Sequence, residues 1–386
     1  MTDESYMKRA LSLARKGKRW TSPNPMVGCV VVKDGKIIGE GYHKRFGEDH
    51  AEINAINSAS ESLEGSTFYV SLEPCSHHGK TPPCVDRIID SGAACVIAGV
   101  LDPNPSVSGR GIKKLKNHGI ETRVGVLEEE CRDLNEKFFT FMTTKIPFVT
   151  LKYAQTIDGR IASATGHSQW ISSKASRRFA HALRAEHDAV LVGVDTVIRD
   201  NPELTVRLAR GRNPVRIIVD STLRIPDDAT IVQNQRKATT LIAVTPQSSQ
   251  KKRLHFRERG IETLVIDEGG AGRVDLRKLL IALGEKGLSS VLVEGGSNII
   301  TSFVKEGLPD RIVIITAPKI LGRGIEAVGD LGIQTVDESI RLSVKRIMKK
   351  GDDIVADLRL MAPLKVMNRV IASPDEIGTR QSNKYG

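Results

Sequence analysis

The stretch SLEPCSHHGKTPPC at residues 71–84, with the triplet HAE at residues 50–52 before it, is the most specific pattern in this chain. It offers one imidazole, from His50, and two thiols, from Cys75 and Cys84, and each thiol follows a proline. An imidazole and two thiolates are good zinc ligands, and three protein ligands leave a fourth position for water. Zinc lowers the pKa of such a water to roughly 7. The pattern therefore predicts a catalytic zinc centre rather than a closed structural one.

Glu52 lies two residues after His50, at the same end of a predicted helix. A carboxylate beside the water would take its proton and later pass it to a leaving amine. Zinc-dependent nucleobase deaminases carry H-x-E followed by P-C-x-x-C, whereas eight residues separate Cys75 from Cys84 here. His77 and His78 are rival ligands in the intervening loop. Substrate contact or a solvated loop suits them better, because a Cys-x-His pair would crowd one side of a tetrahedral site.

Length and composition indicate a two-domain globular protein. The chain has 386 residues, of which 40% are hydrophobic and 27% charged, and this excludes a disordered chain, a collagen-like repeat and a disulfide-dense mini-protein. No apolar run approaches the ~18 residues of a membrane-spanning helix. The first residues show no signal peptide, so we expect a cytoplasmic protein whose five cysteines are not a disulfide framework.

Strand and helix patterns alternate along both halves, which predicts two α/β domains. A boundary falls near residue 146, giving domains at 1–146 and 147–362 and a flexible tail at 363–386. In the first domain we expect helices at 4–18, 50–60, 83–91, 109–118 and 128–143, and strands at 27–33, 36–41, 67–72, 93–100 and 120–126. In the second we expect strands at 148–153, 189–194, 215–220, 240–244, 263–266, 290–293 and 311–317.

The net charge of +11 is unevenly distributed. Residues 1–146 contain 20 Lys and Arg against 19 Asp and Glu, whereas residues 147–386 contain 37 against 27. The second half is therefore expected to meet an anion, either nucleic acid or a phosphorylated small molecule, or simply to have a solvated basic surface. Sparse aromatic residues and the lack of a long basic block argue against nucleic acid.

A second candidate site follows the strand that ends near residue 293. The run VLVEGGSN at residues 291–298 is typical of a strand, two glycines and a helix start. Glycines let a pyrophosphate approach the backbone, and a helix N-terminus supplies N–H donors. No G-x-G-x-x-G follows a strand, so a Rossmann site is not supported. A plain Gly-Gly turn remains the alternative.

Several runs together resemble the RibD (RibG) family of bifunctional riboflavin biosynthesis enzymes, over about residues 1–360. In the first half these are NPMVG at 24–28, HAE at 50–52, the 71–84 stretch with its eight-residue cysteine gap, DPNP at 102–105 and GRG at 109–111. In the second half they are TLKYA at 150–154, DGRIA at 158–162, SQWI at 168–171, VGVDT at 192–196 and DNPELTVR at 200–207.

The resemblance implies an α/β fold of two three-layer domains, the first like cytidine deaminase and the second like dihydrofolate reductase. It implies zinc-dependent deamination of 2,5-diamino-6-ribosylamino-4-pyrimidinone 5'-phosphate, then NADPH-dependent reduction of the ribosyl group to a ribityl chain. Assembly into a homo-oligomer through the reductase domains is implied as well.

The resemblance also implies roles for individual residues. Zinc would be held by His50, Cys75 and Cys84, with Glu52 moving protons. The pyrimidine or its phosphate would be held by Asn24, His43, His77, Lys80, Asp102 and Asn104. NADPH would be contacted by Ala154, Trp170, Thr196, Asp200, Ser221, Gly296, Ser297, Asn298, Ile299, Ile300 and Thr301. The second substrate would be contacted by Ser168, Arg184, Leu204, Arg207 and Glu294, with Lys152 as a polar or proton-donating helper.

Simpler interpretations stay open for several of these residues. Asn24 and Asp102 precede prolines and are also typical of turns. Arg184 and Arg207 suit phosphate, which a guanidinium binds bidentately, but a solvated surface would explain them too. Trp170 would pack on the nicotinamide or in the core.

Two other functions compete with the main one. The first is deamination of another base, free or in RNA, by a domain fused to a nucleotide-binding regulatory module. The second is a purely structural zinc domain. We expect a phosphorylated pyrimidine as partner, and neither nucleic acid nor a membrane.

Overall fold

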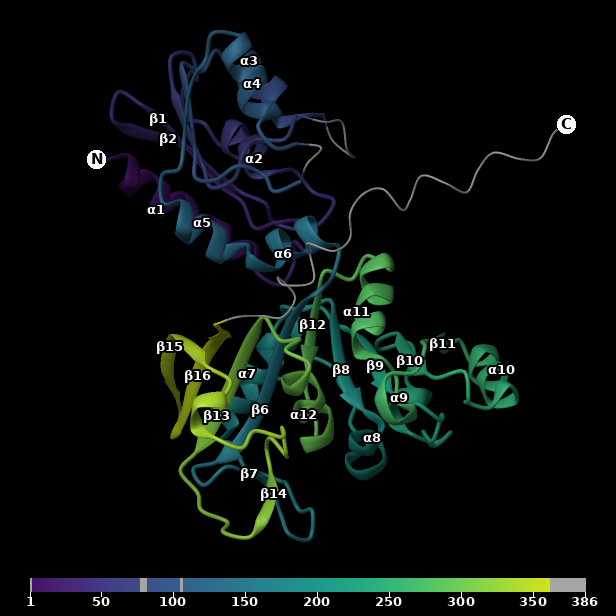
Figure 1. Cartoon of the computed structure of the whole chain (residues 1–386). Coiled ribbons are helices and arrows are strands. Elements are labelled where there is room, and N and C mark those ends of the chain that lie inside the picture. Colours follow the sequence, from purple (N-terminus) through teal and green to yellow (C-terminus); the bar gives the residue numbers. More distant parts are fainter. Residues whose placement is uncertain (1, 77–81, 105–106, 362–386) are drawn as a thin grey trace, which may run out of the picture.

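The computed structural model describes residues 2–76, 82–104 and 107–361. His77 and Lys80, and the tail expected at 363–386, lie outside the described residues. Figure 1 shows two α/β units, with the N-terminal unit above the C-terminal one.

The N-terminal unit is built on a five-stranded sheet in the order β2-β1-β3-β4-β5. Its strands are β1 (Gly28–Lys33), β2 (Lys36–Tyr42), β3 (Thr67–Val70), β4 (Cys95–Ala98) and β5 (Glu121–Val124). β1 pairs antiparallel with β2 and β3, and β3, β4 and β5 run parallel. The β1–β2 turn contains Asp34 and Gly35, both with positive φ, as a tight hairpin requires. All five strands expected from the sequence are thus confirmed.

Helices cover both faces of this sheet, so the unit has three layers. On one face lie α1 (Asp3–Ala14), α5 (Glu128–Leu134) and α6 (Glu136–Thr144); on the other lie α2 (Ala51–Asn57), α3 (Cys84–Asp90) and α4 (Arg110–Asn117). Successive strand residues point to opposite faces. Val30 accordingly packs with the first group and Val31 with the second. This confirms the three-layer, deaminase-like expectation.

The helix expected at 128–143 is interrupted, so that expectation was wrong in one detail. Buried Asn135 separates α5 from α6, and its side chain forms two hydrogen bonds with the backbone of Met26. The amide of Met26 donates to Asn135 Oδ1 (2.8 Å), and Asn135 Nδ2 donates to the carbonyl of Met26 (2.9 Å). The backbone of Asn135 itself is non-helical (φ −112°, ψ 25°). Phe138 and Met142 of α6 line the pocket of the first site.

The C-terminal unit has a nine-stranded sheet in the order β11-β10-β9-β8-β12-β6-β13-β16-β15. Its strands are β6 (Phe148–Thr156), β8 (Ala189–Gly193), β9 (Val215–Val219), β10 (Thr240–Val244), β11 (Glu262–Val265), β12 (Ser290–Val293), β13 (Arg311–Ala317), β15 (Leu342–Lys350) and β16 (Asp353–Leu360). The first seven confirm the expected strands. β15 and β16, which pair antiparallel at the sheet edge, were not expected, nor was the small β7 (Arg160–Ser163) and β14 (Gly324–Glu326) pair.

Helices again cover both faces of the sheet. α11 (Leu276–Glu285) and α12 (Ser297–Lys305) pack on one face. The other face carries α7 (Lys174–Ala185), α8 (Val194–Asp200), α9 (Thr230–Gln233) and α10 (Gln250–Glu258). The neighbouring strands β8 and β12 therefore lead into helices on opposite faces. In open α/β sheets, ligands bind outside the carboxyl ends of strands at such a switch point.

The N-terminal unit contacts the amino ends of the second sheet. Lys137 Nζ donates to the carbonyl of Glu186 (2.6 Å), and Ser22 Oγ donates to Asp188 Oδ1 (2.6 Å), both just before β8. Arg359 on β16 also bonds to Glu136 on α6 (2.6 Å). The switch point thus lies at the far end of the sheet from this interface.

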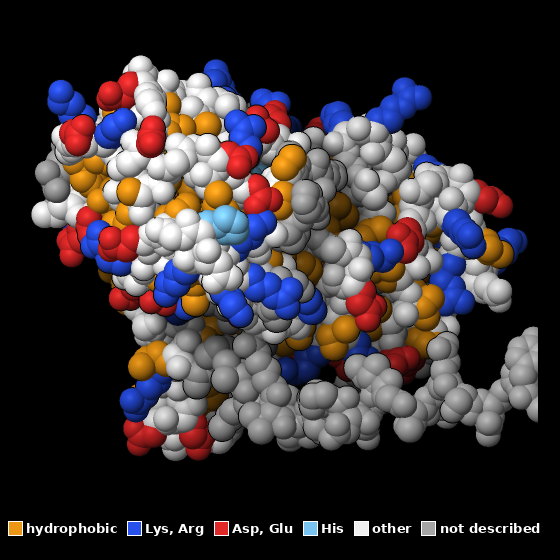
Figure 2. All heavy atoms as spheres, turned by 90° about the horizontal axis from the view of Figure 1, so that it is seen from above, with side chains coloured by type: hydrophobic (Ala, Val, Ile, Leu, Met, Phe, Trp, Pro, Cys, Tyr) orange, Lys and Arg blue, Asp and Glu red, His pale blue; other side chains and the backbone are white. Residues whose placement is uncertain are grey.

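Seen from above the N-terminal unit, Lys and Arg side chains are interspersed with Asp and Glu (Figure 2). Within the described part of the chain, no helix has the length and apolar character needed to cross a membrane.

Candidate active sites

The first site brings together the three predicted zinc ligands. One nitrogen of His50 and the sulfur atoms of Cys75 and Cys84 all lie within 4.8 Å of one another. His50 Nδ1 is 3.6 Å from Cys75 Sγ and 3.3 Å from Cys84 Sγ. All five cysteines of the chain are free thiols. The convergence of one imidazole and two thiols fits a zinc ion with a fourth position left for water.

Local structure explains why these side chains meet. His50 is the extended residue that precedes α2, and Cys84 is the first residue of α3, after Pro83. Cys75 follows β3 and accepts a hydrogen bond from the backbone N–H of Cys84 (3.4 Å). Hydrogen bonds from Cys84 and from His50 lower the pKa of Cys75 to about 4. A thiolate at this position is the form that binds zinc.

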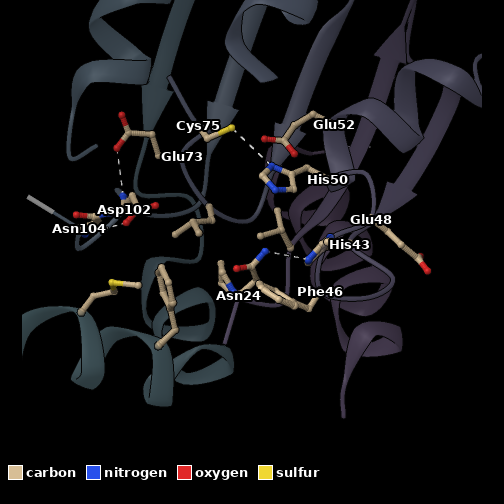
Figure 3. Close-up of a pocket in the computed structure, with 16 residues that line it drawn as sticks. Asn24, His43, Phe46, Glu48, His50, Glu52, Glu73, Cys75, Asp102 and Asn104 are labelled. Atoms are coloured by element: carbon tan, nitrogen blue, oxygen red, sulfur yellow. Dashed lines mark hydrogen bonds between the residues drawn. The ribbon is translucent and has the colours of Figure 1, made fainter. Parts of the chain in front are cut away.

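Glu52 lies in the first turn of α2 and is buried, with its side chain beside the three ligands. Burial is the main cause that raises the pKa of its carboxyl to about 7, and the sulfur of Cys75 raises it further. A group whose pKa is close to neutral can both accept and return a proton. Figure 3 shows Glu52, His50 and Cys75 pointing toward the same space. Glu52 is thus well placed to act on a water held by the metal.

A cavity of about 270 Å³ opens in front of these residues. Asn24, His43, Asp102 and Asn104 all line it, as expected from the resemblance. Asn24 Nδ2 lies 3.4 Å from His43 Nε2, and burial lowers the pKa of His43, which favours the neutral imidazole. Asp102 Oδ1 accepts the backbone N–H of Asn104 (2.8 Å), so the turn expected at this position is present as well.

Sequence reasoning missed several residues of this site. Buried Glu73 accepts backbone N–H bonds from Gly109 (2.9 Å) and Gly111 (2.9 Å), and also from Asp102 (3.2 Å). Its carboxylate thereby fixes the loop that carries Asp102 and the start of α4. Phe46, Glu48, Phe138 and Met142 also line the cavity. Its position, two residues before Cys75, indicated that Glu73 lies near the site, but not that it binds the loop.

The second site lies at the switch point between β8 and β12. α12 begins at Ser297 without a side-chain cap, and a side chain at the preceding Gly296 would meet no atom within 4 Å. Gly295 has a φ of +126°, which only glycine adopts easily. An open helix N-terminus that allows close approach to the backbone suits a phosphate group. The arrangement therefore fits the pyrophosphate of NADPH.

The residues of the range Gly296–Thr301 differ in the hydrogen-bonding groups that they can offer to NADPH. The first three backbone N–H groups of a helix lack partners within it, so Ser297, Asn298 and Ile299 have donors to offer. Ile300 already donates its N–H to Gly296 (3.3 Å), and the side chains of Ile299 and Ile300 are buried. Thr301 Oγ1 accepts the N–H of Gly329 (2.8 Å). Direct contact with NADPH is thus less favoured for Ile300 and Thr301 than for residues 296–299.

A buried charge cluster lies beside Gly295. Glu294 Oε2 accepts hydrogen bonds from Arg184 Nη2 (2.7 Å) and Nε (3.2 Å), and Glu294 Oε1 lies 3.9 Å from Lys152 Nζ. Despite burial, which opposes the shift, the two cations lower the pKa of Glu294 to about 2. Burial lowers the pKa of Lys152. Glu294 Oε1 is buried without a hydrogen-bond partner among the described residues, and it therefore offers an acceptor to a bound hydroxyl.

His181 is a neighbour of this cluster that the sequence did not reveal. It is buried on α7, and its Nδ1 accepts the backbone N–H of Arg207 (3.0 Å). Burial, together with Arg184 and Arg207, lowers the pKa of His181 to about 4, so the imidazole is neutral at physiological pH. The Arg207 guanidinium is half exposed and pairs with Glu203 (3.1 Å). His181 thereby fixes the backbone that presents Arg207.

The remaining predicted contacts occupy different surroundings. Trp170 is 60% exposed, which argues against the alternative of a core position, and the Arg177 guanidinium lies over its ring (4.1 Å). The side chain of Leu204 is buried in a core cluster, which leaves its backbone for contact. Ser221 Oγ accepts the N–H of Val274 (3.1 Å). Thr196 lies beside Gly295, Ala154 lies on β6, Asp200 ends α8, and Ser168 is half buried between β7 and α7.

Comparisons with known proteins agree with the two α/β units. Residues 1–100 match the cytidine and deoxycytidylate deaminase zinc-binding region, and residues 147–356 match the RibD C-terminal domain. The riboflavin biosynthesis protein RibD of Aquifex aeolicus is 49% identical over 354 residues, which is 92% of this chain and 97% of the relative. RibD of Escherichia coli is 40% identical over 372 residues, covering 93% of this chain and 99% of the relative.

Solved structures give the same result. RibD of Acinetobacter baumannii superposes with a TM-score of 0.84 at 34% identity, covering 93% of this chain and 99% of the other. A Thermotoga maritima protein described as a diaminohydroxyphosphoribosylaminopyrimidine deaminase/5-amino-6-(5-phosphoribosylamino)uracil reductase superposes with a TM-score of 0.80 at 40% identity. That match covers 93% of this chain and 98% of the other.

Fold and sites together define a bifunctional enzyme, in which a zinc-dependent deaminase is joined to an NADPH-dependent reductase. The chain belongs to the RibD family of riboflavin biosynthesis proteins.

Proposed function

We propose that the N-terminal site deaminates a diaminopyrimidinone ribosyl 5'-phosphate and that the C-terminal site reduces the ribosyl group of the product. The observation that carries the first half is the convergence of His50, Cys75 and Cys84 beside buried Glu52. The Thermotoga relative, a diaminohydroxyphosphoribosylaminopyrimidine deaminase and 5-amino-6-(5-phosphoribosylamino)uracil reductase by its description, supports both substrates. We further propose residues 1–146 as the deaminase and 147–362 as the reductase.

In the deaminase, His50, Cys75 and Cys84 would hold the zinc ion, which when bound makes water a nucleophile at neutral pH. Glu52 would take one proton from that water as its oxygen bonds to the ring carbon that bears the amino group. Glu52 would then deliver the proton to the amino nitrogen. The carbon–nitrogen bond to the amino group breaks, ammonia leaves, and the ring carbon keeps the oxygen as a carbonyl while the second proton of the water ends on the neighbouring ring nitrogen.

The walls of the cavity would orient the pyrimidine. Asn24 and neutral His43 offer a donor and acceptor pair from one side, and Asp102 and Asn104 face them from the loop that Glu73 fixes. His77 and Lys80 stay proposed contacts to the base or phosphate, although they lie outside the described residues.

In the reductase, NADPH supplies a hydride when bound. The N-terminal amides of α12, with Ala154, Trp170, Thr196, Asp200 and Ser221, would hold the cofactor. Arg184 and Arg207 would bind the substrate phosphate or sugar, with Ser168, Leu204 and Glu294 around them. As the anomeric carbon takes the hydride, its bond to the ring oxygen breaks and that oxygen needs a proton. Lys152 is the proposed donor, because burial already favours its loss of a proton.

A coupled assay tests the proposal. Purified protein loaded with zinc would be mixed with the diaminopyrimidinone ribosyl phosphate and NADPH, and ammonia release and NADPH absorbance would be followed together. We expect both signals, with NADPH loss dependent on prior ammonia release. Ammonia without NADPH loss would leave a deaminase joined to a nucleotide-binding module, and no signal at all would contradict both assignments.

We also propose that the chain forms a homo-oligomer through its reductase domains. β15 ends the nine-stranded sheet, and the β15–β16 pair exposes the apolar side chains of Val344, Ile347 and Ile354. Exposed apolar groups on a sheet edge are typical of sites that associate with another chain. A second copy would bury them.

The variant Val344→Lys/Ile347→Lys should shift the protein from an oligomer to a monomer, because it places four charges in a two-fold interface of this kind. Multi-angle light scattering after size exclusion measures the change. Val265→Lys is the control, since Val265 is 51% exposed at the opposite edge of the sheet. An oligomer that persists in the double variant, or a wild-type monomer, contradicts this interface.

A further inference from the structure

A cavity of about 420 Å³ lies between the two domains. Its upper wall includes residues 15–26, at and after the end of α1, and parts of α5 and α6. Its lower wall includes Glu186, Ser289 and Arg311, at the amino ends of β8, β12 and β13. The cavity is therefore separate from the reductase site at the carboxyl ends of those strands. It adjoins the deaminase pocket, because Asn24, Pro25 and Phe138 line both.

The cavity carries an excess of positive charge. Eight lysine and arginine residues line it, against four aspartates and glutamates. Counting the partners outside the lining, Asp188 with Arg212 and Lys345 with Asp133, leaves this excess at four. In a partly enclosed space, like charges repel more strongly than in bulk water. An anion in the cavity would relieve this repulsion.

Two of the guanidinium groups, one from each domain, have unused hydrogen-bonding capacity. Among the described residues, Arg15 of the deaminase domain and Arg346 of the reductase domain have no ion-pair partner. The guanidinium groups of Arg19 and Arg212 are already paired, with Glu186 (3.6 Å) and with Asp188. Arg15 and Arg346 therefore have N–H donors to offer to a ligand rich in acceptor oxygens.

We propose that this interdomain cavity is a binding site for a small phosphate ester, held by arginines of both domains. A guanidinium binds phosphate oxygens bidentately, and the volume is within the range of small-molecule sites. Met26, Leu134 and Phe138 supply an apolar part of the wall for the organic portion of the ligand. The ligand would join the two domains and would lie next to the deaminase pocket. This site is independent of the substrates proposed above.

The test is a calorimetric titration of the zinc-loaded full chain with ribose 5-phosphate and, separately, with inorganic phosphate. The variant Arg15→Gln/Arg346→Gln removes one guanidinium from each wall without breaking an ion pair among the described residues. We expect the wild type to bind one more equivalent of ribose 5-phosphate than the variant, or to bind it about 100-fold more tightly, since two charge-assisted interactions are lost. The variant Arg15→Lys/Arg346→Lys should retain the additional site.

Arg236→Gln/Arg257→Gln is the matched control, because it removes the same charge from exposed positions next to α9 and on α10. It should bind like the wild type. Zinc content, thermal unfolding and oligomeric state would be compared across all variants to verify the fold. Identical stoichiometry and affinity in the wild type and the glutamine variant would overturn the proposal. Binding of inorganic phosphate but not of ribose 5-phosphate at this site would overturn the assignment of an organic ligand.

Discussion

Replacing Glu52 by glutamine should slow ammonia release by a factor of about 10² to 10⁴, the range that a positioned general acid–base contributes. The substitution keeps the size and approximate polarity of the side chain, but an amide can neither accept the proton of the water nor deliver it to the leaving amine. Reduction of substrate that has already been deaminated should continue at the wild-type rate, because the reductase site lies at the far end of the second sheet. Separate assays of ammonia and NADPH, with each substrate supplied directly, measure both effects.

Two measurements make this result specific to proton transfer. The zinc content of Glu52→Gln should equal that of the wild type, since His50, Cys75 and Cys84 are unchanged. Glu64→Gln makes the same chemical change at an exposed position of the same domain and should have no effect. If ammonia release survives in the Glu52 variant with its zinc in place, the proposed role of Glu52 is wrong.

Replacing Glu294 by glutamine should abolish most of the reductase activity and destabilise β12, the strand that ends just before it. The carboxylate is the shared partner of Arg184 and Lys152, and removing its charge leaves two buried cations unpaired. Breaking a buried ion pair in this way costs about 3–5 kcal/mol. Hydrogen-exchange protection of the β12 amides should then fall by about two orders of magnitude. NADPH oxidation should fall while ammonia release is retained.

The pH dependence of the same variant gives an independent measurement. The pKa of Glu294 is about 2 in the folded protein, against an ordinary value of 4.5. The ionised carboxylate therefore contributes about 3 kcal/mol to the free energy of unfolding at pH values above 4.5. This contribution is lost as the pH falls from 4.5 toward 2. The difference in protection between wild type and Glu294→Gln should be full at pH 7 and should narrow over this acidic range.

Glu326→Gln is the matched control for the reductase domain. Glu326 pairs with Arg160 (2.8 Å) but is 60% exposed, and a surface pair of this kind contributes about 0–1 kcal/mol. In this control, the hydrogen-exchange protection of β12 and the rate of NADPH oxidation should equal those of the wild type. Equal protection of β12 in the Glu294 variant and the wild type at pH 7 would contradict the buried charge cluster.

The sequence predicted the zinc centre well because its ligands lie at points where the local chain conformation is set by nearby residues. His50 precedes a helix and Cys84 follows two prolines, so their places at helix starts could be inferred from short-range signals. The strands from β1 to β13 other than β7, and the two three-layer domains, were predictable for a similar reason. Alternating or continuous apolar runs, such as residues 28–33 and 189–193, directly indicate buried strands.

Residues whose role depends on distant partners could not be found in this way. Asn135 lies at the break between two helices and bonds to the backbone of distant Met26. Glu73 organises a loop about thirty residues further along the chain. β15 is exposed along most of its length and has no strong apolar pattern. None of these features is encoded within the few residues around it.

The amino-acid sequence by itself therefore determined the chemistry of the zinc ligands, the order of strands and helices, and the division into two α/β units. Tertiary structure alone decided that His181 supports Arg207, that Arg184 and Lys152 share one carboxylate, and that arginines of both domains face a common cavity. The physical reason is the range of the interactions. Periodicity and capping act over one or two turns of the chain, whereas charge pairing and cavity formation depend on residues that only folding brings together.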